Sequence, residues 1–125
     1  MVKAIISTII ATILVIGLSI IEQNYLNKTF SEFSEILKCV QEKTEEETSV
    51  KEDVLSIQNF WIEKKKTLHV FIPHNDIKEI DLWIAEAVSL VENDNFLDAL
   101  SKLEVVIELT QQIPKTYKFK LENIL

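Results

Sequence analysis

One long uncharged segment, residues 4–21, constrains this chain more than any other feature; it reads AIISTIIATILVIGLSII. Eleven of its eighteen residues are Ile, Leu or Val. A helix of this length spans roughly 27 Å, which is close to the hydrocarbon thickness of a bilayer. On an insertion scale the aliphatic residues contribute about −5 kcal/mol. The segment therefore predicts a transmembrane helix, with the remaining residues forming a domain tethered to the membrane.

An alternative interpretation is a cleaved signal peptide. Gly17 and Ser19 form a small-x-small pair of the kind that signal peptidase recognises, and cleavage there would release a secreted protein. We favour an uncleaved signal-anchor because apolar residues continue through Ile21 and because Lys3 is the only charged side chain before the segment. With Glu22 on the other side, the positive-inside rule predicts that residues 1–3 are cytoplasmic and that residues 22–125 are extracytoplasmic.

Residues 22–125 have the composition of one small helical domain. The whole chain contains one Gly and two Pro, too few for the turns of a β-rich fold. All 13 basic residues are Lys, and 12 of them lie beyond the segment with the 20 acids, giving that part a net charge of −8 (12 − 20). Without Arg or a basic excess, nucleic acid is excluded as an expected partner, and so is tight docking on anionic lipid.

Apolar periodicity divides the domain into four helices, expected at residues 22–47, 50–71, 76–92 and 95–113. The first has apolar residues at heptad steps: Leu26, Phe30, Phe33, Leu37 and Val40. Nothing interrupts the chain before it, so we expect the transmembrane helix to continue into it as one rod, with Asn24 as the place for any bend. Capping-box patterns at residues 49–52 and 76–79 predict the starts of the second and third helices.

The last two expected helices resemble the hairpin of a tetratricopeptide repeat, in which an aromatic, a small Ala and spaced aliphatics let antiparallel helices pack closely. The matching residues are Phe96, Ala99, Leu100, Leu103 and Ile107. One unit is no array, so the resemblance implies the packing and not peptide binding. The predicted fold is all-α: a transmembrane helix that continues into an antiparallel, up-and-down four-helix bundle.

The tail, residues 114–125, has two possible patterns. Tyr117, Phe119 and Leu121 alternate with lysines as in a strand, whereas Tyr117, Leu121, Ile124 and Leu125 fit a helical stripe. We expect Pro114 to end the fourth helix, and the tail to form a short helix or an extended segment over the bundle. Its apolar residues would complete the core or bind another protein, so the interaction candidates are Tyr117, Phe119, Leu121, Ile124 and Leu125.

No pattern in the sequence indicates chemistry, and we expect no catalytic, metal-binding or cofactor-binding residue. His69 and His74 are five residues apart, whereas two zinc ligands on one helix are usually four apart. The only glycine, Gly17, lies in the apolar segment, which leaves none for a phosphate loop or a nucleophile elbow. Cys39 is either an inert thiol or one half of an intermolecular disulfide. Residues 64–66, three lysines, are either a solvated helix end or a lipid contact.

Several short stretches resemble the family named domain of unknown function 4363, which consists of short bacterial single-pass membrane proteins. These stretches are residues 72–77 (IPHNDI), 80–83 (IDLW), 98–103 (DALSKL) and 113–125, from Ile113-Pro114 to LENIL. The resemblance implies the same architecture, one N-terminal span followed by about a hundred helical residues. The family has no assigned activity, so no functional residue is carried over. Members of the family tend to be encoded near multi-pass membrane proteins, and the resemblance therefore implies an accessory role for this chain.

Three functions remain as hypotheses. The first is a non-enzymatic module that binds a protein partner at the outer face of a bacterial membrane, with a multi-pass membrane protein as the candidate. The second is an extracytoplasmic sensor, which predicts a ligand cavity lined by Trp61 and Trp83. The third is a small envelope hydrolase, which predicts a buried or clustered pair of acids.

Overall fold

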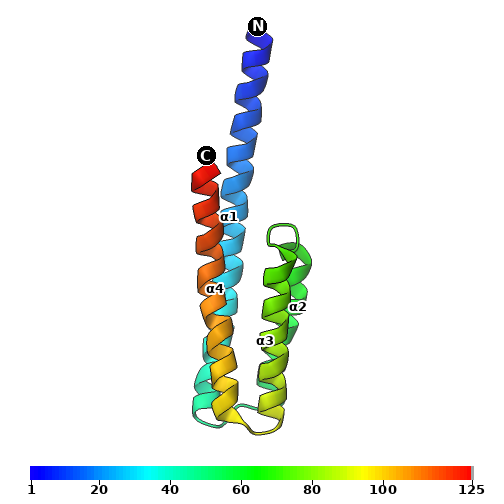
Figure 1. The fold of residues 1–125 in the computed structure, drawn as a ribbon, viewed down its shortest axis with the longest axis vertical. Helices are drawn as coiled ribbons and strands as arrows, with labels where there is room; N and C mark the ends of the chain where they lie inside the picture. Colours follow the sequence, from blue (N-terminus) through cyan, green and yellow to red (C-terminus); the bar gives the residue numbers. More distant parts are fainter. Residues whose placement is uncertain (125) are drawn as a thin grey trace.

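The structure, a computed structural model, describes the backbone of residues 1–124 and the side chains of residues 1–118. It contains four α-helices: α1 (Val2–Glu45), α2 (Lys51–Leu68), α3 (His74–Glu92) and α4 (Phe96–Ile124). Successive helices run in opposite directions, and α1 projects far beyond the others at one end (Figure 1). The predicted all-α fold, a long apolar N-terminal helix that continues into an antiparallel four-helix bundle, is confirmed.

Each helix of the bundle packs against two neighbours. α1 contacts α2 and α4, and α3 also contacts α2 and α4. The α1–α4 and α3–α4 contacts are the most extensive, so the expected hairpin of the last two helices is present. Figure 1 shows the first and last helices side by side although they come from opposite ends of the chain.

The core follows the heptad predicted for the first helix. Buried residues of α1 recur at steps of three and four: Leu26, Thr29, Phe30, Phe33, Leu37, Val40 and Thr44. The Phe33 ring stacks against the rings of both Phe60 and Trp61, with centroids 5.4 and 5.5 Å away. Full burial of such side chains contributes about 2–3 kcal/mol each, so this aromatic stack is a main stabilising contact between α1 and α2.

α1 consists of an exposed apolar half and a core half within one helix of 44 residues. Residues 2–16 are all exposed, and the first buried residue is Leu26. The helix is long and apolar enough to cross a membrane, and no part of its apolar window is buried by the rest of the chain. Because the helix continues through Asn24 into the core, no linker separates the apolar half from the bundle.

The predicted caps of the second and third helices were wrong. α2 begins at Lys51, and its first turn is closed by Asp53, whose Oδ2 accepts a hydrogen bond of 2.9 Å from the Val50 N–H. Ser49 does not cap the helix, because the N-cap is Val50 and the buried Ser49 hydroxyl lies within hydrogen-bond distance, 3.0 Å, of Thr44 Oγ1. α3 begins at His74, directly after Pro73. This start lies two residues before the predicted start at residue 76.

The predicted end of the fourth helix was also wrong, because Pro114 lies inside α4. Proline lacks the N–H that would bond the Thr110 carbonyl, and its ring crowds that carbonyl, at a cost of about 3 kcal/mol. Burial of Ile113 and Pro114 offsets this cost. In addition, Gln23 Nε2 on α1 donates a hydrogen bond of 3.2 Å to the Pro114 carbonyl. Tertiary packing therefore keeps the helix going where local propensity would end it.

Candidate interaction surface

Tyr117, the one interaction candidate whose side chain the structure describes, joins two helices at the end of the bundle from which the apolar half of α1 projects. Its hydroxyl donates a hydrogen bond of 3.1 Å to Asp76 Oδ2 on α3, and its half-buried ring packs against the core. Burial raises the pKa of Tyr117 to about 12, and the hydrogen bond to Asp76 and the negative charges of Asp76 and Glu22 add to the rise. Tyr117 thus has a structural contact here.

The other four interaction candidates lie outside the residues whose side chains the structure describes: Phe119, Leu121, Ile124 and Leu125.

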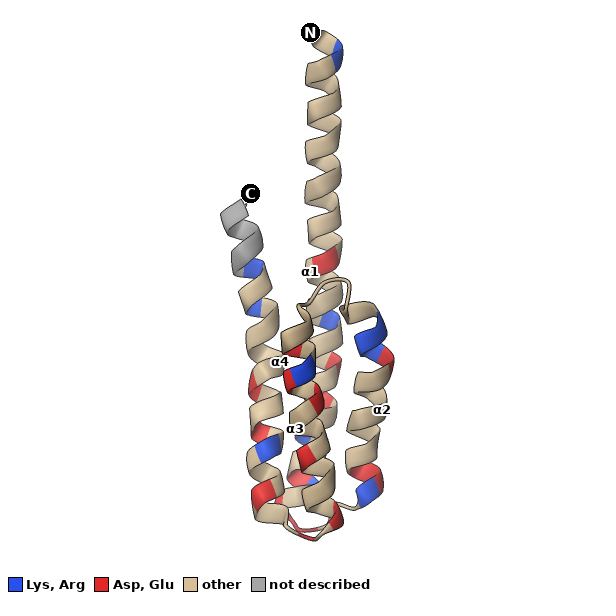
Figure 2. Ribbon diagram, turned by 45° about the vertical axis from the view of Figure 1, so that its right-hand side comes forward, with Lys and Arg blue, Asp and Glu red and all other residues tan. Residues whose placement is uncertain are grey.

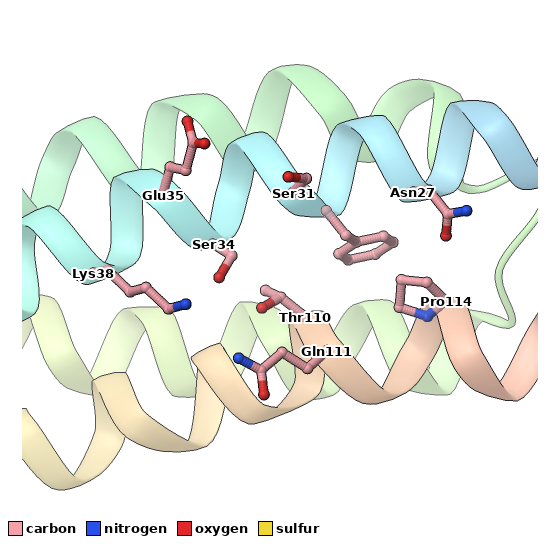
Figure 3. A pocket seen from close by; sticks show the side chains of 9 residues that line it. Asn27, Ser31, Ser34, Glu35, Lys38, Thr110, Gln111 and Pro114 are labelled. Atoms are coloured by element: carbon pink, nitrogen blue, oxygen red, sulfur yellow. The ribbon is translucent and has the colours of Figure 1, made fainter.

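A groove between α1 and α4 is a better-defined candidate surface. It is open and has a volume of about 370 Å³. Figure 3 shows Ser34 and Thr110 pointing into it from facing helices, whereas Glu35 points away from α4. Its lining residues are Asn27, Phe30, Ser31, Ser34, Glu35, Lys38, Thr110, Gln111 and Pro114.

The lining of this α1–α4 groove consists mainly of short hydroxyl and amide side chains. The Thr110 hydroxyl already donates to the Ile107 carbonyl at 2.6 Å, which leaves mainly serine, asparagine and glutamine groups to meet a partner. Such side chains allow a helix backbone to approach closely and to exchange hydrogen bonds. The sequence held a signal for this groove in the polar residues at positions 27, 31 and 34, between the heptad positions, but it did not show which helix faces them.

Both tryptophans named for a ligand cavity are already in contact with protein groups. Trp61 is 2% exposed, its ring stacks on Phe33, and its Nε1 donates a hydrogen bond of 2.5 Å to Asp81 Oδ1. Lys65 Nζ lies 3.3 Å from the same carboxylate oxygen. The ammonium of Lys102 lies 4.8 Å from the centroid of the Trp83 ring. These contacts connect α2, α3 and α4.

The indole N–H of Trp83 is buried and has no hydrogen-bond partner among the residues that the structure describes. A buried donor without a partner costs roughly 1–3 kcal/mol, so Trp83 is a site where the bundle is less stable than it could be.

Three aspartates of the bundle bond groups that hold the fold together. Asp53 accepts from the Val50 N–H and lies 2.9 Å from Lys43 Nζ, and these two contacts lower the pKa of the Asp53 carboxyl. Asp76 accepts from Tyr117, and Asp81 from Trp61. Each carboxylate therefore has a structural partner on another part of the fold.

The two histidines meet at the connection between α2 and α3, where their ring centroids are 5.8 Å apart. Within the described residues, no group of three or more His, Cys, Asp and Glu side chains could hold a metal ion. Cys39 is exposed on α1.

These observations define a class of protein: a small four-helix bundle built directly onto one long apolar helix. The chain belongs to the family described as domain of unknown function DUF4363, which matches residues 20–124. No curated protein and no solved structure matches the chain. The match begins at the last residues of the apolar segment, so the family covers the bundle and excludes most of the projecting helix. The resemblance seen in the short stretches is confirmed.

Proposed function

We propose that this protein is a non-enzymatic accessory module, anchored by residues 4–21 at the outer face of a bacterial membrane, where its bundle binds a protein partner. The observation that carries the proposal is the construction of α1, whose apolar half is exposed while its second half is core. Such a large exposed apolar surface needs an apolar environment, and a bilayer provides one of matching length. Lys3, the only charged side chain before the segment, supports an orientation with residues 1–3 in the cytoplasm.

A multi-pass membrane protein is the partner that this geometry favours. The α1–α4 groove begins at Asn27, six residues beyond Ile21, and continues along α1 to Lys38. A partner helix that crosses the bilayer beside residues 4–21 and extends past the surface would reach the groove without changing direction. Small polar side chains such as Ser31 and Ser34 suit close packing of that helix.

Site-specific photo-crosslinking in cells tests this proposal. A photoreactive residue at Ser34 or at Gln111 is expected to capture the same protein, because the two positions line one groove. Asn59, exposed on α2, is the matched control and is expected to capture no such protein. Equal yields from all three positions, or no captured protein from Ser34 and Gln111, would contradict the proposal.

A further inference from the structure

Charge in the bundle is divided along its long axis. We define the proximal end as residues 22–28, 63–79 and 113–118, next to the projecting half of α1. It contains seven Lys and four acids, a net charge of +3 (7 − 4). Residues 29–62 and 80–112 contain four Lys and fifteen acids, a net charge of −11 (4 − 15). Figure 2 shows this division, with acids concentrated toward the end opposite the N-terminus.

Two of the four acids of the proximal end contact other side chains of that end. Glu63 lies 3.6 Å from Lys66, and Asp76 accepts the hydrogen bond from Tyr117. Of the three consecutive lysines, Lys65 is paired with Asp81 and Lys64 lies 5.6 Å from the centroid of the Phe60 ring. Lys66, Lys115 and Lys118 are exposed. Lys28 and Lys78 are exposed as well, but they lie further from the apolar segment than Lys115 and Lys118. Lys115 and Lys118 are therefore the ammonium groups nearest to an anionic surface, with Lys66, whose exposed pair with Glu63 is 3.6 Å long, beside the α2–α3 connection.

Two contacts set the height of the proximal end relative to the apolar segment. The rings of Tyr25 and Phe71 are 5.8 Å apart, which places the α2–α3 connection level with Tyr25. Tyr25 is four residues, or about 6 Å, beyond Ile21, and the headgroup layer is roughly 5–8 Å thick on each side of a bilayer. The bond from Gln23 to Pro114 places Lys115 and Lys118 at this level or nearer the hydrocarbon, where long lysine side chains extend back to the headgroups.

The α2–α3 connection also presents an apolar side chain at this height. Val70 is 77% exposed, although its neighbour Ile72 is buried. The Val70 N–H bonds the Thr67 carbonyl at 3.1 Å, and the Phe71 N–H bonds the Leu68 carbonyl at 2.9 Å. Because these backbone donors are satisfied within the turn, the connection can enter the interface without leaving them unpaired.

We infer that the proximal end docks on an anionic phospholipid surface, with Val70 entering the interface and Lys66, Lys115 and Lys118 contacting lipid phosphates. This inference rests on the membrane anchor of the proposed function. The net charge of −8 over residues 22–125 predicted no tight docking on anionic lipid. The inference reverses that expectation, because the net charge is the sum of a basic end and a strongly acidic remainder. The acidic remainder is repelled by the same surface, so the bundle stands upright on the membrane.

Depth measurement on the full-length protein in vesicles tests the docking. A spin label is attached at V70C in a C39S background, in vesicles of phosphatidylcholine with or without phosphatidylglycerol. The matched control is L97C, since Leu97 is 80% exposed at the other end of the bundle. We expect the label at position 70 to be shielded from a water-soluble nickel chelate, more strongly with phosphatidylglycerol. A label at position 70 as accessible as the one at position 97 would overturn the inference.

Charge variants separate lipid docking from simple proximity. The K66Q/K115Q/K118Q variant is expected to lose the extra shielding in phosphatidylglycerol vesicles, while K38Q, on α1 outside the proximal end, retains it. Circular dichroism verifies that both variants are folded. Unchanged shielding in the triple variant would overturn the inference.

The vesicles contain no other protein, so these results do not depend on a partner. Loss of docking with retained crosslinks at Ser34 would refute only this inference. Release of the chain from vesicles by alkaline carbonate would refute the anchor, and with it the docking.

Discussion

Gln23 Nε2 donates a hydrogen bond of 3.2 Å to the carbonyl oxygen of Pro114, 91 residues further along the chain. The same amide group lies 3.0 Å from Asn27 Oδ1. This contact fixes the register of α4 against α1 just beyond the apolar segment. Pro114 is also the residue at which the sequence predicts the end of the fourth helix, whereas α4 continues through it.

Replacing Gln23 by Ala is expected to lower the free energy of unfolding by about 1 kcal/mol, the usual net contribution of one hydrogen bond. The Gln23 Oε1 atom is buried without a partner among the described residues, so Q23L should cost less than Q23A. Urea unfolding of the full chain in detergent measures both, with N24A as the exposed control. Equal stability of Q23A and the wild type would show that the contact does not hold α4 in register.

The two tryptophans are expected to respond differently to the same substitution. W61F removes the donor to Asp81 and part of a fully buried ring, so it should destabilise the bundle by about 2–3 kcal/mol. W83F removes a buried N–H that has no partner among the described residues, so its effect should be within about 1 kcal/mol of zero. Thermal unfolding monitored by circular dichroism compares them. A larger loss for W83F would contradict this description of the core.

The pair Lys43–Asp53 predicts a pH-dependent stability. The hydrogen bond from the Val50 N–H, and after it the contact with Lys43, lower the pKa of Asp53 in the folded state, so their stabilisation is complete above the unfolded pKa and is lost as the pH falls through the folded pKa. The pKa of Lys43 is raised, mainly by its hydrogen bond to Asp53, so its contribution is lost in the alkaline range. D53N should therefore lose less stability than the wild type between neutral pH and about pH 3. E46Q, an exposed acid, is the control, and identical acid profiles for D53N and the wild type would contradict the prediction.

Tyr117 predicts a second, alkaline dependence. Its folded pKa of about 12 lies above the ordinary value of 10.0, so the unfolded chain ionises first and stability falls as the pH rises between these values. Tyrosinate absorbance should show one of the two tyrosines of the folded protein titrating near 12, and Y117F should abolish that component. D76N should lower this pKa only in part, because burial is the largest cause. A Tyr117 titration near the ordinary value would contradict the buried contact.

The core was predictable from the sequence because one period describes both the pattern and the packing. Leu26, Phe30, Phe33, Leu37 and Val40 stand at heptad steps, and each is buried. The apolar segment was predictable for a different reason, because its length and composition alone define a helix able to cross a bilayer.

Tertiary contacts decided the features that the sequence did not predict. A proline such as Pro114 ordinarily ends a helix, yet here the burial of Pro114 and the hydrogen bond from Gln23 keep α4 continuous. Ser49 and Asp76 fit local capping patterns, but Thr44 and Tyr117, respectively, bind them instead. The α1–α4 groove and the basic proximal end are formed by residues of distant segments that lie at the same position along the bundle axis. No local sequence pattern contains that information.

Labelling of the native Cys39 with a membrane-impermeant maleimide tests most directly the central claim that α1 crosses the membrane and holds the bundle outside. Cys39 is exposed on the core half of α1, and K3C in a C39S background places a thiol on the other side of the apolar segment. After mild reduction of intact cells, we predict that Cys39 is labelled and that K3C is labelled only after lysis. Protection of Cys39 together with labelling of K3C in intact cells would contradict the claim.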